Sequence, residues 1–253
     1  MSYKIILILL FACPTWAQKS DPASGKVIHL LTMEAPPYMS TTLPEQGAAV
    51  YALRQIFKKN GFELKVTFTP YLRAKILALK KDSISGFFPA AEENITAGYV
   101  LSKIMYVTPW GFAERKDHPI QWNNPEDLLP YKIGNVMGYE LSRVLAPAHK
   151  KKKFQIENVS SDELNLLKLA NKRVDLAFID ATMLEYLIKS SPQLRPYQNH
   201  LQINAKIIRM DEYGVAFKKT GKGKEHLNVF NKIMNKEEFH RLVELYFKTH
   251  LQN

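Results

Sequence analysis

Residues 62–69 read Phe-Glu-Leu-Lys-Val-Thr-Phe-Thr, which is the clearest alternation of apolar and polar side chains in the chain. A period of two places the apolar side chains on one face of a β-strand. Asn60 and Gly61 directly precede this stretch and match the left-handed cap that often ends a helix. The stretch therefore predicts a strand that follows a helix, which is the repeating unit of an α/β fold.

The flanking segments repeat this unit. Residues 27–33 form a compact apolar run that predicts a buried strand, and apolar side chains recur at helical spacing over 50–57. A short helix over 73–81 and a strand over 84–88 are expected next. The order strand, helix, strand, helix, strand favours a parallel sheet that is covered by helices.

The pattern restarts after Arg115. Ser160 and Glu163 have the spacing of a capping box at the start of a helix. Two helices are expected at the end of the chain. We therefore predict two α/β lobes with a cleft between them, rather than one continuous sheet. The strands expected in this second part lie at 131–137, 154–159, 174–179, 203–210 and 213–217.

The start of the chain indicates export. A lysine precedes an apolar run over 5–12, and residues 15–17 (Thr-Trp-Ala) resemble a small-x-small cleavage site. Residues 1–17 are therefore predicted to be a signal peptide, and the mature protein is expected to be periplasmic and monomeric. Residues 10–13 also resemble a lipoprotein processing site, so lipidation of Cys13 is the alternative.

Composition and motifs exclude several classes of protein. The net charge of +11 over 253 residues permits nucleic-acid partners. The positive charges are scattered, however, apart from residues 150–153, and the predicted export argues against nucleic-acid partners. A single cysteine excludes a disulfide framework, and the seven histidines form no His-Glu-x-x-His pair. Phosphate-loop, dinucleotide and nucleophile-elbow motifs are missing from the sequence. We therefore expect no metal, no cofactor, no nucleic-acid partner and no enzymatic activity.

Polar and aromatic side chains at strand ends form the candidate site, because α/β folds place ligands there. Tyr38 follows the first strand on a Pro-Pro turn, and Arg73 opens a helix where its guanidinium could hold a carboxylate; a surface position is the alternative for both. Asp180 ends a buried strand and could hold an ammonium group, or could cap the next helix. Phe87 and Phe88 could form an apolar wall or belong to the core.

Tyr139 completes this set of strand-end candidates. It follows Gly138 at the predicted start of a helix, where free backbone N–H groups could receive an anion. Because every helix has such a start, this position indicates a binding site only together with the other candidate residues.

In their order and spacing, these features resemble the family 3 bacterial extracellular solute-binding proteins, the polar amino-acid type of periplasmic receptor. The resemblance implies a two-lobe periplasmic binding protein fold of type II, with lobe one at 26–110 plus 213–253 and lobe two at 111–212. Two crossings would join the lobes near 110–115 and 210–213. The matching stretches cover nearly the whole mature chain and lie at 34–38, 47–68, 71–88, 101–106, 128–139 and 160–180.

The resemblance implies that lobe closure captures a small polar solute, an amino acid or a related amine or carboxylate, for an ABC-type importer. In receptors of this type an arginine in a Thr-x-x-Arg-like motif usually holds the α-carboxylate, whereas residues 92–95 of this chain read Glu-Glu-Asn-Ile. Arg73 is the substitute that we expect, unless the ligand differs. Asp180 matches the position that holds the ammonium group in the family.

Two other functions remain open on the same fold. The protein could be a ligand-sensing protein that feeds a membrane receptor. It could also be a periplasmic dehydratase, which needs a carboxylic acid in the cleft. Glu34 and Glu140 are the acids that such an enzyme would use, and Glu34 is also a candidate for contact with the ligand.

Overall fold

The structure, a computed structural model, describes residues 26–92, 95–139, 141, 145 and 153–250. The predicted signal peptide and Cys13 lie outside the described residues, as do Glu140 and all of the basic run except Lys153. These predictions therefore stay predictions. Within the described ranges, no helix is long and apolar enough to cross a membrane.

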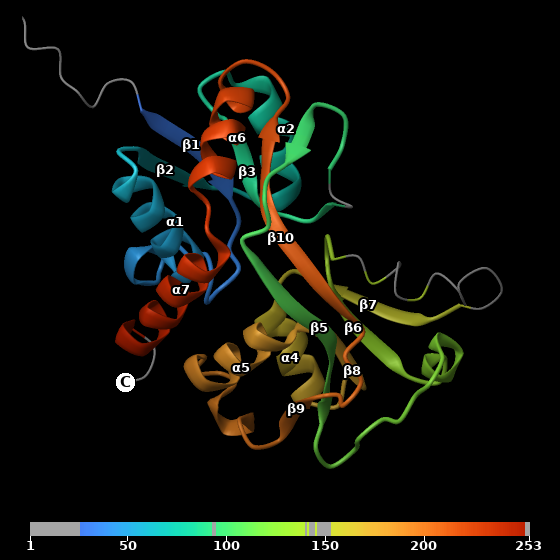
Figure 1. Cartoon of the computed structure of the whole chain (residues 1–253). Coiled ribbons are helices and arrows are strands. Elements are labelled where there is room, and N and C mark those ends of the chain that lie inside the picture. Colours follow the sequence, from blue (N-terminus) through green and yellow to red (C-terminus); the bar gives the residue numbers. More distant parts are fainter. Residues whose placement is uncertain (1–25, 93–94, 140, 142–144, 146–152, 251–253) are drawn as a thin grey trace, which may run out of the picture.

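The first group of elements is built around three parallel strands, β1, β2 and β3. β1 lies between β2 and β3, and its register with β2 runs from Val27 opposite Glu63 to Thr32 opposite Phe68. α1 buries its apolar stripe and packs along α7 (Figure 1). The predicted strand at 62–69 is thereby confirmed. The group comprises β1 (Val27–Thr32), α1 (Ala48–Lys59), β2 (Glu63–Phe68), α2 (Tyr71–Lys80), β3 (Gly86–Ala90), β4 (Tyr99–Leu101), α6 (Lys222–Ile233) and α7 (Lys236–His250).

The second group repeats this plan. β6 lies between β7 and β8 in a parallel arrangement, and α4 and α5 both contact β8. The predicted cap of α4 is wrong by one residue, because the hydroxyl of Ser161, not Ser160, accepts a hydrogen bond from the Leu164 N–H. The group comprises β6 (Lys132–Val136), β7 (Gln155–Val159), α4 (Asp162–Ala170), β8 (Leu176–Asp180), α5 (Ala181–Ser190) and β9 (Leu201–Ile203).

Two long antiparallel strands join the groups. β5 (Tyr106–Arg115) and β10 (Arg209–Lys218) pair with each other over Tyr106–Trp110 and Arg209–Tyr213. The rest of β5 pairs with β8 and β9, and the rest of β10 pairs with β3 and β4, so both strands run from one group into the other (Figure 1).

This pairing corrects two predictions. The two groups do not carry separate sheets, because the paired strands connect them into one ten-stranded sheet. Eight of its strands follow the order β2-β1-β3-β10-β5-β8-β6-β7, while β4 pairs with β10 and β9 pairs with β5. The strand predicted at 203–210 is also wrong, since β9 ends at Ile203 and β10 begins at Arg209.

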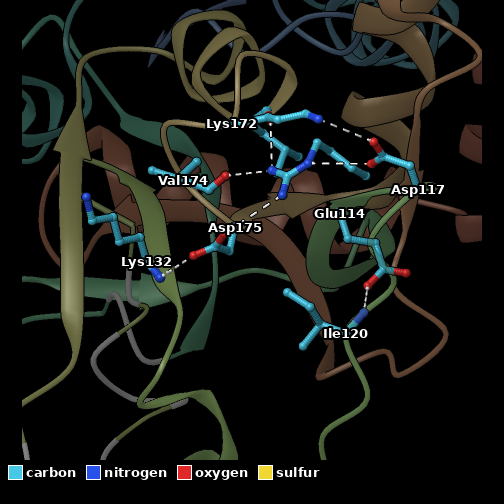
Figure 2. A network of polar contacts seen from close by, with 9 residues as sticks. Glu114, Asp117, Ile120, Lys132, Lys172, Val174 and Asp175 are labelled. Atoms are coloured by element: carbon cyan, nitrogen blue, oxygen red, sulfur yellow. Dashed lines mark hydrogen bonds and ion pairs between the residues drawn. The ribbon is translucent and has the colours of Figure 1, made fainter.

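A buried arginine, Arg115, holds the second group together; Figure 2 labels its contact partners Asp117, Val174 and Asp175. Arg115 ends β5 and is 7% exposed. Its Nη1 donates to the carbonyl oxygens of Leu169, at 3.1 Å, and Val174, at 2.9 Å. Its Nη2 lies 3.8 Å from Asp175, whose other oxygen accepts a hydrogen bond from the Lys132 N–H. One side chain therefore ties the end of α4 to the starts of β6 and β8.

We expect Arg115→Ala to lower the free energy of unfolding by about 2–4 kcal/mol, because two buried carbonyls lose their donor and Asp175 loses its partner. Urea denaturation followed by circular dichroism measures this change. Lys172→Gln is the matched control, because Lys172 approaches the neighbouring Asp117 at 3.7 Å but is 71% exposed. The control should cost about 0.5 kcal/mol or less. Equal losses in both variants would contradict the role given to Arg115.

Candidate functional site

One face of the β5–β10 ribbon forms the floor of the candidate site. Side chains alternate between the two faces of a strand, so every second residue of each strand points to the same side. The opposite face carries Met210, which is 58% exposed. The three cross-strand pairs on the site face are Tyr106 with Tyr213, Thr108 with Asp211, and Trp110 with Arg209.

A cavity of about 120 Å³ lies over this floor. Residues from both groups of elements form its walls: the segment after β1 and the start of α2 on one side, and the segment after β6 and the start of α5 on the other. Six of the residues are aromatic. The lining consists of Met33, Ala35, Tyr38, Met39, Tyr71, Pro89, Tyr106, Trp110, Met137, Gly138, Tyr139, Asp180, Met183, Arg209, Asp211 and Tyr213.

Tyr38 lies in the wall that the first group contributes, as predicted. Its ring stacks on Tyr106 with centroids 5.1 Å apart and an angle of 16° between the planes. The Tyr38 carbonyl accepts the Ala49 N–H at the start of α1. This close approach requires glycine at position 47, where φ is +97° and a Cβ atom would lie 2.6 Å from the Tyr38 oxygen. Burial raises the pKa of the Tyr38 phenol, which therefore stays neutral at physiological pH.

Asp180 caps α5 and also lies in the wall of the cavity. Its Oδ1 accepts the N–H groups of Thr182, at 2.7 Å, and Met183, at 3.1 Å, which caps α5. The same side chain lines the cavity and is 4% exposed. Burial raises the pKa of Asp180, although the hydrogen bonds from the two capping N–H groups oppose the shift.

Arg209 is a site residue that sequence reasoning missed. Its Nε lies 2.7 Å from Asp211 Oδ1, and its guanidinium carbon lies 5.8 Å from the Trp110 ring and 5.6 Å from the Phe178 ring. The sequence signal that could have identified Arg209 was its alternation with Asp211 and Tyr213 in a short strand. Nothing in the sequence, however, shows that this strand pairs with β5.

Tyr139 borders a second, larger cavity of about 780 Å³. Its hydroxyl donates to Asp162 Oδ2 at 2.6 Å, and its ring meets Trp110 edge-on at 4.9 Å. Glu34 also lies in this wall, where the Thr41 N–H and hydroxyl donate to its carboxylate. The two cavities share Met33, Tyr71, Met137, Tyr139 and Met183.

Three predicted site residues do not line either cavity. Arg73 is exposed on α2, because a helix turns about 100° per residue and Tyr71 already faces the cavity. Phe87 and Phe88 are both fully buried, since β3 is covered on both faces. The cavity meets Pro89 instead. The prediction that Arg73 faces the cleft is therefore wrong.

The charge of Asp162 is unusually sensitive to pH. Burial raises the pKa of Asp162 to about 7; the hydrogen bond from Tyr139 opposes this shift and the charge of Asp180 adds to it. Between about pH 4 and 7 the folded chain therefore binds a proton that the unfolded chain releases. The contribution of this group to the free energy of unfolding is largest below this range and is lost as the pH rises through 7.

We expect the Asp162 carboxyl to titrate near pH 7 in NMR spectra of carbon-13-labelled protein. The Tyr139→Phe variant should titrate still higher, because it lacks the opposing hydrogen bond. In Asp162→Asn, unfolding experiments should show no loss of stability attributable to this group between pH 4 and 7. Titration of Asp162 near pH 4 would contradict this account.

Comparisons with known proteins address the fold. No protein-family model matches the sequence, and no curated protein matches it. The ligand-binding core of GluR0 from Nostoc punctiforme in complex with L-glutamate is 19% identical, with a TM-score of 0.66 over 87% of this chain and 98% of that one. The substrate-binding protein of an amino acid ABC transporter is 19% identical, with a TM-score of 0.65 over 88% and 99%. A histidine kinase sensor domain similar to periplasmic binding proteins is 18% identical, with a TM-score of 0.63 over 88% and 91%.

These similarities define the class of architecture. The chain adopts the α/β fold of the two-lobe periplasmic binding proteins, and the predicted fold class is confirmed. The resemblance to family 3 of the extracellular solute-binding proteins is thereby confirmed at the level of the fold. Within the described ranges, no group of three or more His, Cys, Asp or Glu residues is arranged to hold a metal ion.

Proposed function

We propose that this protein is an exported, monomeric solute-binding protein that captures a small polar solute, an amino acid or a related amine or carboxylate, by lobe closure. The proposed lobes span 26–110 plus 213–253, and 111–212. The observation that carries the proposal is the composition of the first cavity, whose walls combine Tyr38 from one lobe with Asp180 from the other. A ligand that contacts both walls favours the closed arrangement, because only that arrangement provides all of its contacts.

The lining suits recognition of a small molecule rather than catalysis. Small-molecule sites combine mostly apolar and aromatic walls with a few charged groups, as this cavity does. Glu34, the described acid that a dehydratase would use, is exposed and accepts hydrogen bonds from Thr41. It is therefore open to water and already engaged by Thr41, unlike a general acid positioned in a closed site.

We propose an ABC importer as the partner, on the similarity to the substrate-binding protein of an amino acid ABC transporter. The similarity to a histidine kinase sensor domain supports the alternative, in which the closed form signals to a membrane receptor. Co-purification of the liganded protein with the membrane permease or with a sensor kinase distinguishes the two.

A thermal-shift screen of amino acids, amines and small carboxylates should identify a ligand, because a compound that binds only the folded state raises its melting temperature. With that compound, Tyr38→Ala should weaken binding about tenfold or more, since a buried aromatic contact is worth about 1–2 kcal/mol. Arg73→Ala is the control and should bind within about twofold of the wild type, because Arg73 lies outside both cavities. A screen without any hit would argue against the proposed function.

The proposed export, and the cleavage of the signal peptide that it requires, can be tested separately from ligand binding. N-terminal sequencing of the protein from a periplasmic extract should begin at Gln18, because cleavage is predicted after Ala17. Mass spectrometry should show no acyl chains. A chain that begins at acylated Cys13 would instead establish the lipoprotein alternative, and a chain that retains Met1 in the cytoplasm would contradict export.

A further inference from the structure

The walls of the two cavities are acidic, although the whole chain carries a net charge of +11. Among the described lining residues there are five carboxylates and one guanidinium. No lysine or histidine lines either cavity within the described ranges. The carboxylates belong to Glu34, Asp162, Glu163, Asp180 and Asp211, and the guanidinium belongs to Arg209.

The guanidinium is already engaged by the protein. Arg209 Nε lies 2.7 Å from Oδ1 of Asp211, which is two residues further along the same strand, and the guanidinium carbon of Arg209 lies 5.8 Å from the ring of Trp110 and 5.6 Å from that of Phe178. The pair is neutral as a unit, so it leaves the charge of Asp180 without a compensating cation in the first cavity. A ligand carboxylate that approached the other N–H groups of Arg209 would also approach the like charge of Asp211.

Of the helix starts at the cavities, those of α4 and α5 carry acidic groups, whereas α2 has none in its first turn. Asp180 accepts the first N–H groups of α5, and Ser161 caps α4 directly before Asp162. Free N–H groups of this kind would otherwise receive an anion. The starts of α4 and α5 instead each present a carboxylate toward the cavity wall.

Two further features favour a cation. Asp162 accepts a hydrogen bond on Oδ2 from Tyr139, while its Oδ1 is closed off from solvent and has no hydrogen-bond partner among the described residues. The rings of Trp110 and Tyr139 line the first cavity, whereas the ring of Tyr106 is stacked against Tyr38 and Phe239. The faces of aromatic rings attract cations and not anions.

From this charge distribution we infer that the ligand is an organic amine that carries no carboxylate, rather than an α-amino acid. The inference rests on the proposed function and narrows its class of ligand. The ammonium group lies against Asp180 and the aromatic rings, and its remaining chain extends along the shared Met and Tyr residues toward Asp162. A carboxylate in this space would meet like charges, which cost several kcal/mol when they face each other in an interface.

Matched pairs of compounds that differ only by the carboxylate test this inference. Isothermal titration calorimetry compares arginine with agmatine, lysine with 1,5-diaminopentane, and tyrosine with tyramine. In the pair that fits, the amine should bind at least about tenfold more tightly than the amino acid, which corresponds to about 1.4 kcal/mol. Equal or tighter binding of the amino acid would overturn the inference but leave the proposed function intact. Binding by none of these compounds and none in the wider screen would overturn both.

Charge-removing variants locate the subsite. Asp180→Asn keeps the cap of α5, because asparagine caps helices about as well as aspartate, but removes the charge. It should weaken amine binding at least tenfold. Asp127→Asn, which alters a capping carboxylate outside both cavities, should leave binding unchanged. If Asp180→Asn does not fold, Asp162→Asn takes its place with the same expected loss. Unchanged affinity in the folded variant would overturn the placement of the ammonium group.

Discussion

The pairing of β5 with β10 is the constraint on which the site depends. Its register places Tyr106 opposite Tyr213 and Trp110 opposite Arg209 on one face. Because side chains alternate along a strand, a slip of one residue would turn these groups away and present the opposite face, with the largely exposed Met210, to the cavity. Backbone hydrogen bonds, rather than individual side-chain contacts, therefore decide which chemistry reaches the ligand.

Three of the acidic groups around the cavities are held by neutral local donors, whereas Asp211 is paired with Arg209. The N–H groups of α5 hold Asp180, the Tyr139 hydroxyl holds Asp162, and Thr41 holds Glu34. Hydrogen bonds of this kind fix the position of a carboxylate without neutralising it. The negative field is therefore left for a ligand to neutralise, whereas the buried Arg115 compensates the acid beside it within the protein itself.

Local patterns predicted most of the helices and parallel strands but not the strands that form the floor of the site: β5 was not predicted, and β10 begins inside the stretch predicted as a strand at 203–210. The alternation at 62–69 identified β2 because it depends only on neighbouring residues, and strand ends correctly placed Tyr38, Tyr139 and Asp180 in cavity walls. The floor joins segments about a hundred residues apart, and no local pattern reports such a pairing. Arg73 was misplaced because the prediction used its position at a helix start without the rotation of about 100° per residue that turns it away.

The ribbon is both the connection between the lobes and the floor of the cavity, and this double role limits how the proposed closure can proceed. If the register of β5 with β10 persists, the contacts of a ligand with Tyr106, Trp110 and Tyr213 are the same in the open and closed forms. Contacts that do not change between two states cannot favour either of them. Closure must then be driven by the walls, where Tyr38 and Asp180 approach the ligand from opposite lobes. The floor accordingly sets affinity, and the walls convert binding into movement.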